Sequence, residues 1–111
     1  MKYKKTILID LDGVLNQYTG RFDKDFIPPI KDGAREFITK LSEKYEIKLF
    51  TTRNSEKAYN WLNENNLNDI IKEVTYTKDL CWLIVDDRCL RFTGDYETFL
   101  DEIENFKPWY K

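Results

Sequence analysis

Residues 6–14 read TILIDLDGV, a short apolar and β-branched run that ends in two aspartates and a glycine. The run Thr6 to Ile9 predicts a buried strand. Side chains two residues apart leave a strand on the same side, so Asp10 and Asp12 are expected to point the same way from its end. Carboxylates about 4 Å apart repel by about 4 kcal/mol at an effective dielectric of about 20, and a divalent cation is the simplest compensation. Gly13 lets the chain turn sharply there.

Acids and glycines also begin ordinary loops after strands, and DxDG alone does not separate the two cases. A calcium-binding EF-hand loop is excluded. It requires an acid or amide, a glycine and a glutamate at the positions that Val14, Leu15 and Arg21 occupy. The rest of the chain must therefore decide what the two aspartates do.

Composition narrows the function classes. A chain of 111 residues is expected to form one domain, residues 1–111, and 41% hydrophobic residues supply its core. The net charge of −2 gives no sign of a nucleic-acid-binding surface. The sequence has no histidine, which excludes a Ser-His-Asp triad and a His-ligated zinc. Neither Cys81 nor Cys89 is followed by an arginine six residues later, so a cysteine-phosphatase loop is also excluded. Carboxylates are the leading candidates for any nucleophile or acid–base group.

Two further features bear on localisation. No apolar run approaches 18 residues, so no membrane span is expected. The first strand begins almost at Met1, which leaves no room for a signal peptide, and the two cysteines are expected to be reduced thiols. These features predict a cytoplasmic protein.

The hydrophobic pattern predicts the following elements in order. Residues 14–29 form a loop that can cover the acids, with a small hairpin over Tyr18–Phe22 that turns at Gly20. Asp32 is the expected N-cap of a helix, whose apolar face is Ala34, Phe37, Ile38, Leu41 and Tyr45. Residues 47–50 predict a second strand, and Asn54 or Ser55 caps a second helix, with Ala58, Trp61 and Leu62 facing inward.

The second half continues the alternation. Residues 73–76 predict a short strand, and residues 82–85, WLIV, predict a buried parallel strand. A last helix, ended by Pro108, places on one face Phe99, Leu100, Ile103 and Phe106. The order predicts an α/β fold, a three-layer Rossmann-like parallel sheet with flanking helices.

Ligands of such sheets lie outside the carboxyl ends of the strands. Polar residues follow three of the predicted strands there: Asp10 and Asp12, then Thr51, Thr52 and Arg53, then Asp86 and Asp87. Lys78 lies just before the last of these strands. A coherent set of acids, hydroxyls and cations at three strand ends predicts a site.

In these residues the chain resembles the haloacid dehalogenase-like (HAD) hydrolase superfamily. Its four motifs correspond to DLDGV at residues 10–14, Thr51, Lys78 and the acid pair Asp86–Asp87, in the family's order over nearly the whole chain. Residues 13–50 and 52–77 separate the motifs, and neither interval has room for a separate cap domain.

The resemblance implies a capless, Mg²⁺-dependent phosphatase. Asp10 would be the nucleophile that forms an aspartyl-phosphate, and Asp12 the general acid and base. Mg²⁺ would be held by Asp10, by the Asp12 backbone carbonyl, and by Asp86 or Asp87, with Asp87 preferred. The phosphoryl oxygens would be bound by Lys78 and by the segment that contains Thr51, Thr52 and Arg53.

Other interpretations stay open at this point. Lys78 can be one more surface lysine, and Arg53 and Arg88 can be partners in surface ion pairs. A receiver-like phosphoacceptor module uses similar residues, but there the acid pair comes first in the chain. A catalytically inactive binding relative is a third alternative.

The absence of a cap predicts how the site is shielded. Cover must come from the loop 14–29, with Tyr18, Arg21 and Phe22, and from outside the chain. We therefore expect a bulky or macromolecular phosphorylated substrate, with 3′-phosphorylated nucleic acid among the candidates, or a homodimer that shields the site.

Overall fold

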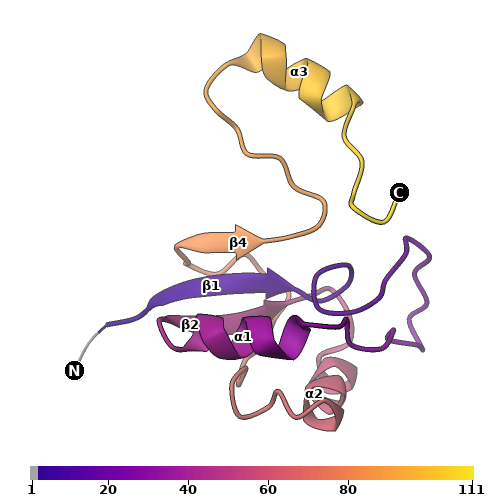
Figure 1. Cartoon of the computed structure of the whole chain (residues 1–111), viewed down its shortest axis with the longest axis vertical. Helices are drawn as coiled ribbons and strands as arrows, with labels where there is room; N and C mark the ends of the chain where they lie inside the picture. Colours follow the sequence, from indigo (N-terminus) through magenta and orange to yellow (C-terminus); the bar gives the residue numbers. More distant parts are fainter. Residues whose placement is uncertain (1–2) are drawn as a thin grey trace.

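The computed structural model describes residues 3–111, and this part of the chain contains four strands and three helices (Figure 1). In chain order they are β1 (Lys5–Asp10), α1 (Ala34–Ser42), β2 (Tyr45–Phe50), α2 (Ser55–Glu64), β3 (Val74–Thr75), β4 (Leu83–Val85) and α3 (Tyr96–Glu104). The strands form one sheet in the order β3-β2-β1-β4, and all three pairings are parallel. Their carboxyl ends therefore share one edge, at which the polar residues gather.

The core lies on one face of the two central strands. β1 is almost completely buried at Ile7, Leu8 and Ile9. Alternate residues of β1 and β2 point to the same face, where they pack with α1, α2 and the segment after α2. The core cluster is Ile7, Ile9, Leu11, Leu15, Ala34, Ile38, Ile47, Leu49, Ala58, Trp61, Leu62, Leu67 and Ile71. Each fully buried Leu or Ile contributes roughly 1.5–3 kcal/mol, so this cluster anchors the strand ends that carry the site.

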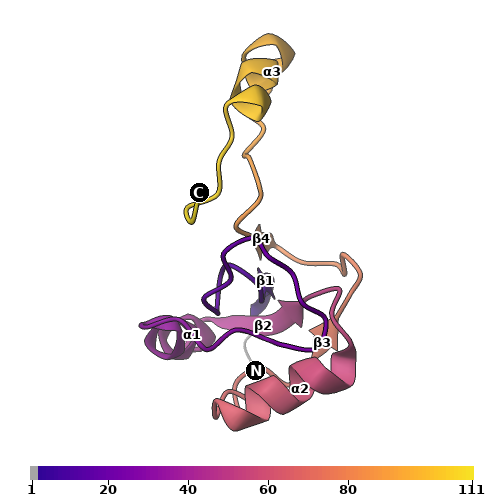
Figure 2. The same ribbon diagram turned by 90° about the vertical axis from the view of Figure 1, so that its right-hand side faces the viewer.

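The predicted fold class is confirmed. The protein is α/β, with a four-stranded parallel sheet flanked by helices, as in a Rossmann-like three-layer fold (Figure 2). Asn54 is the predicted N-cap of α2, and its side-chain oxygen accepts a hydrogen bond from the Lys57 amide. Ala58, Trp61 and Leu62 are buried on α2 as expected.

Two predictions around α1 are wrong. Asp32 does not cap the helix. Gly33 holds the N-cap position with a left-handed φ of 87° and no side-chain cap bond, because Lys31 to Ala34 form a tight turn instead. Tyr45 belongs to β2 and not to the apolar face of α1, since that helix already ends at Ser42.

The segment after the DxDG motif leaves the sheet and returns to it, as predicted, but it forms no hairpin over Tyr18–Phe22. Its base is closed by an antiparallel bridge between Asn16 and Ile30. The Lys31 amide donates to the Leu15 carbonyl at 2.8 Å beside that bridge. The closure lies at the two ends of the loop because only there do two extended segments run side by side.

The second half departs further from the prediction. β4 is an edge strand and not a buried one, with Trp82 52% and Leu83 46% exposed, because no fifth strand covers it in the described part of the chain. α3 buries none of its residues, and Leu100 on its apolar face is 65% exposed. Figures 1 and 2 show α3 set apart from the sheet on an extended connection, with the chain returning afterwards toward the end of β1. Within residues 3–111, no helix combines the length and the apolar character that crossing a bilayer requires.

Candidate active site

A cavity of about 300 Å³ opens at the carboxyl edge of the sheet. Residues from the ends of β1, β2 and β4 and from the loop after β1 line it: Asp10, Asp12, Tyr18, Phe22, Phe50, Thr51, Thr52, Asp86, Asp87 and Arg88. A larger hollow of about 680 Å³ lies at the opposite edge, near Tyr45 and Glu46. We assign the site to the smaller cavity because the convergent acids lie there.

Three carboxylates meet in this cavity. Asp10 ends β1, Asp86 and Asp87 follow β4, and each offers an oxygen so that all three atoms lie within 4.8 Å of one another. Burial, followed by the neighbouring Asp87 and Asp86 carboxylates, raises the pKa of Asp10 to about 9. Burial and the adjacent Asp87 also raise the pKa of Asp86. The trio therefore holds more negative charge than its surroundings compensate, and it can bind a cation through oxygen atoms.

Asp87 packs against the DxDG loop. Its Oδ2 is buried and has no hydrogen-bond partner in the described part of the chain. It faces Gly13, whose φ is +87°, and a Cβ added to this glycine would overlap the Asp87 carboxylate. Gly13 is thus required both for its left-handed backbone and for the close approach of Asp87.

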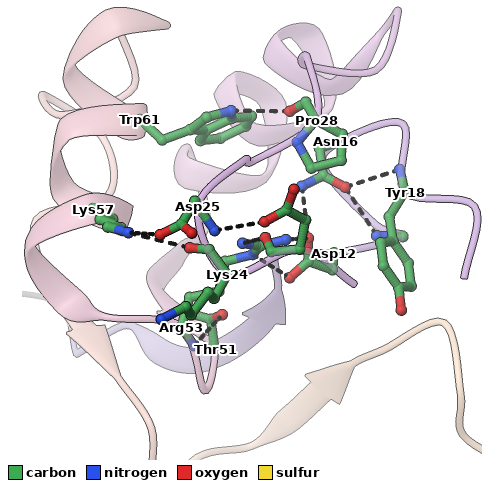
Figure 3. A network of polar contacts seen from close by, with 12 residues as sticks. Asp12, Asn16, Tyr18, Lys24, Asp25, Pro28, Thr51, Arg53, Lys57 and Trp61 are labelled. Carbon is green, nitrogen blue, oxygen red and sulfur yellow. Dashed lines mark hydrogen bonds and ion pairs between the residues drawn. The ribbon is translucent and has the colours of Figure 1, made fainter. Parts of the chain in front are cut away.

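Asp12 lies apart from the trio and is held by a network of its own (Figure 3). Arg53 donates from Nε to Asp12 Oδ2 at 2.8 Å and from a terminal nitrogen to Oδ1 at 3.1 Å. Asn16, which is fully buried, donates to Asp12 Oδ1 at 3.0 Å and accepts from the amides of Gly13 and Tyr18. The loop and the Asp12 carboxylate are therefore fixed as one unit.

Arg53 is 6% exposed, so it is not a partner in a surface ion pair. Besides Asp12 it donates to the Asp23 carbonyl at 2.9 Å, and its guanidinium lies 4.5 Å from the centre of the Phe22 ring. This side chain ties the end of β2 to the loop after β1. Arg88 is exposed and lines the cavity, so it remains free to contact a ligand.

The other predicted site residues separate into two groups. Thr51 is buried in the cavity wall, and its hydroxyl oxygen accepts from the Arg53 amide at 3.2 Å, while Thr52 is exposed at the cavity rim. Lys78 is exposed and is not among the residues that line the cavity. The turn that carries it is held elsewhere, because Asp79 binds the Thr77 hydroxyl at 2.6 Å and Lys48 at 3.6 Å.

Sequence reasoning missed three residues that contact the DxDG loop or Asp87 from outside the cavity lining. Asn16 fixes the DxDG loop, Trp109 donates to the Gly13 carbonyl at 2.6 Å, and Tyr110 lies beside Asp87. An amide four residues after the second aspartate is a weak local signal that could have pointed to Asn16. No local signal points to Trp109 or Tyr110, which are distant in sequence.

Comparisons with known proteins show the fold and nothing beyond it. No protein-family model matches the chain, and no curated protein matches it. Among solved structures, a conserved protein from Bacteroides thetaiotaomicron is similar, with a TM-score of 0.59 and 20% sequence identity. The similarity covers 92% of this chain and 91% of that one, so the same fold extends over nearly the whole length.

Proposed function

We propose that this protein is a Mg²⁺-dependent phosphatase of the HAD type, which hydrolyses a phosphate monoester through an aspartyl-phosphate on Asp10. The observation that carries the proposal is the meeting of Asp10, Asp86 and Asp87 at the carboxyl edge of the sheet, beside a separately held Asp12. Ligands of parallel α/β sheets bind at this edge.

The donor set fits Mg²⁺. All three groups are carboxylates, and hard cations prefer oxygen ligands. Burial, together with the neighbouring Asp87 and Asp86 carboxylates, raises the pKa of Asp10 to about 9, and a positive charge beside these carboxylates would favour their ionised forms. Bound Mg²⁺ would supply that charge, keep Asp10 ionised and neutralise phosphoryl oxygens.

Asp10 is suited to be the nucleophile by position. It is the last residue of β1, which pairs with β2 on one side and with β4 on the other, so its carboxylate is presented from a rigid element. Covalent capture of the phosphoryl group would divide one slow hydrolysis into two easier steps. Such help matters because phosphate-monoester hydrolysis requires accelerations of up to about 10²¹-fold.

Asp12 would protonate the leaving oxygen and then activate water. Both of its oxygens accept hydrogen bonds from Arg53, so proton transfer requires one of these contacts to lengthen. For the phosphoryl oxygens, Thr51 and Thr52 supply donors, and Arg88 is the cation that lines the cavity. Lys78 would contribute only if the turn after β3 moved toward the site.

The cavity bears on the class of substrate. Two aromatic side chains from the loop after β1, Tyr18 and Phe22, are among the residues that line it. We infer a bulky or macromolecular phosphorylated substrate, 3′-phosphorylated nucleic acid included, or a homodimer that completes the cover. A screen over sugar phosphates, nucleotides and 3′-phosphorylated oligonucleotides with Mg²⁺ distinguishes these classes.

The decisive variant is Asp10→Asn. It should abolish Mg²⁺-dependent hydrolysis of an aryl phosphate and binding of beryllofluoride, while an unchanged circular dichroism spectrum shows that the fold survives. Asp69→Asn, an exposed acid away from the cavity, is the matched control. Undiminished turnover in the Asp10 variant would refute the mechanism. Beryllofluoride binding by the wild type without turnover of any phosphate would favour the phosphoacceptor alternative.

A further inference from the structure

The segment after α3 returns to the edge of the sheet that the chain leaves after β4. The chain leaves the sheet after β4, forms α3, and then returns with its C-terminal end toward the loop after β1 (Figure 1). Asp86 and Asp87 directly follow β4, and Trp109 contacts the DxDG loop. The Trp109 indole donates to the Gly13 carbonyl at 2.6 Å across a sequence separation of 96 residues. Lys31 Nζ lies 5.1 Å from the centre of the Trp109 ring. We call residues 108–111 the strap.

Tyr110 brings the strap to Asp87. Its ring packs edge-on against the rings of Tyr18 and Trp109, with distances between ring centres of 5.6 Å and 5.4 Å. Its hydroxyl is buried and makes no hydrogen bond within residues 3–111. The Tyr110 hydroxyl lies beside the Asp87 carboxylate. Tyr110 thus places a buried hydroxyl beside Asp87, whose buried Oδ2 also has no hydrogen-bond partner within residues 3–111.

The two strap contacts act on neighbouring groups. Gly13 approaches Asp87 so closely that an added Cβ would overlap the carboxylate. Trp109 holds the carbonyl of that same glycine, and Tyr110 lies against that same carboxylate. Gly13, Asp87 and the strap thus form one packed unit behind the cation site. Of the residues in this unit, Asp87 lines the cavity and Tyr110 does not.

We propose that the strap sets the orientation of Asp87, with Tyr110 donating a hydrogen bond to Oδ2 and leaving the other oxygen for a divalent cation. Trp109 supports this arrangement by fixing Gly13. Both are positioning residues, since they act through Asp87 and Gly13 and do not line the cavity. This inference rests on the cation site of the proposed function, and it adds a role for a segment that the sequence motifs do not include.

Hydrogen bonds to ligating carboxylates typically change metal affinity by about 10- to 100-fold when they are removed. Tyr110→Phe deletes the hydroxyl and keeps the ring, so the contact with Tyr18 survives. We expect the dissociation constant for Mg²⁺ to rise by about 10-fold in this variant. Trp109→Phe deletes the indole donor, and we expect a smaller rise, about 3- to 5-fold, because its effect on Asp87 is indirect.

The experiment is calorimetric titration of the full-length protein with Mg²⁺ alone. Tyr76→Phe and Trp82→Phe are the matched controls, since both residues are exposed and lie away from the cavity lining. Thermal denaturation without Mg²⁺ accompanies each titration. The proposal expects Tyr110→Phe to lose affinity with little change in the metal-free melting temperature. Wild-type affinity in Tyr110→Phe would overturn it, and so would equal losses in the control variants.

Two readouts separate positioning from a general structural role. The indole N–H resonance that disappears in Trp109→Phe should shift when Mg²⁺ is added to the wild type, and this shift should shrink in Tyr110→Phe. With a phosphatase substrate, excess Mg²⁺ should restore kcat in Tyr110→Phe but not in Asp10→Asn. If the wild type binds Mg²⁺ and hydrolyses no phosphate ester, the proposed function fails and the strap is still tested by affinity. If the wild type binds no Mg²⁺ at all, both fail.

Discussion

Replacing Arg53 with methionine tests whether this arginine holds Asp12 in place. Methionine keeps much of the length and apolar stem of arginine and removes the guanidinium. The change deletes two charge-assisted hydrogen bonds to Asp12 and one to the Asp23 carbonyl. It leaves the Asp12 carboxylate, whose side chain is only 17% exposed, with Asn16 as its remaining side-chain partner.

The size of the effect follows from burial. Removing one partner of a buried ion pair costs about 3–5 kcal/mol, because the other charge is left uncompensated. Asp12 keeps its bond to Asn16 and some contact with water, so we expect the lower end, about 3 kcal/mol. For a domain of this size such a loss lowers the melting temperature by more than about 10 °C. Arg53→Lys keeps the charge but loses the two-pronged geometry, and we expect about half of that cost.

Urea denaturation measures this cost, and a double-mutant cycle with Asp12→Asn isolates the pair. The double variant should be more stable than Arg53→Met alone, because no uncompensated carboxylate remains. Arg91→Met, at an exposed arginine, is the control and should change stability by less than about 0.5 kcal/mol. A cost in Arg53→Met as small as that of the control, or strict additivity in the cycle, would refute the assignment. Because Asp12 is the proposed acid and base, kcat should also fall by about 100-fold in Arg53→Met.

Three further predictions concern the cavity. Because the folded-state pKa of Asp10, about 9, lies above its ordinary value of 3.8, protonation of Asp10 stabilises the metal-free protein at low pH, and this stabilisation is lost as the pH rises from about 4 to about 9. Urea titrations at several pH values should show this fall without Mg²⁺ and a smaller one with it, and Asp10→Asn should be more stable than the wild type at pH 8 without Mg²⁺. Gly13→Ala should lower the free energy of unfolding by at least about 2 kcal/mol, because the residue has φ +87° and the added Cβ would displace Asp87. Calorimetry should then detect no Mg²⁺ binding. The matched control is Gly94→Ala, since Gly94 has a similar φ of +101° and an added Cβ would meet nothing within 4 Å. Alanine substitution of the loop residues Tyr18, Arg21 and Phe22 should raise KM for the true substrate more than for a small aryl phosphate. A monomeric protein whose best substrate is a small sugar phosphate would contradict the inference of a bulky substrate or a shielding dimer.

The sequence alone determined the class of fold and the place of the candidate site. The apolar β-branched run before Asp10 predicts a buried strand, and β1 is the best-buried strand of the sheet. Strand–helix alternation requires parallel pairing, and parallel strands bring their carboxyl ends to one edge. That rule was sufficient to predict that Asp10, Thr51 and the pair Asp86–Asp87 lie around one cavity, as they do.

The local sequence pattern was insufficient where burial or capping depends on which other segments pack against an element. The apolar face of α3 was readable in the sequence, but periodicity reports only that a helix has such a face, and α3 buries none of its residues. The run WLIV predicts a strand equally well at the centre or at the edge of a sheet, and the edge position leaves Trp82 and Leu83 exposed. Asp32 and Gly33 are both compatible with a helix start, and the turn from Lys31 to Ala34 selected the glycine.

Only the tertiary structure decided which side chains hold the acids. Arg53 meets Asp12 across 41 residues, and Trp109 meets Gly13 across 96. A sequence motif records the identity of a residue and its neighbours, whereas these contacts depend on the path of the loop after β1 and on the return of the chain after α3. The same path leaves Lys78 outside the cavity lining and places Tyr110 beside Asp87. Residue types and strand order thus specify the chemistry available at the sheet edge, and chain folding over long sequence distances sets its geometry.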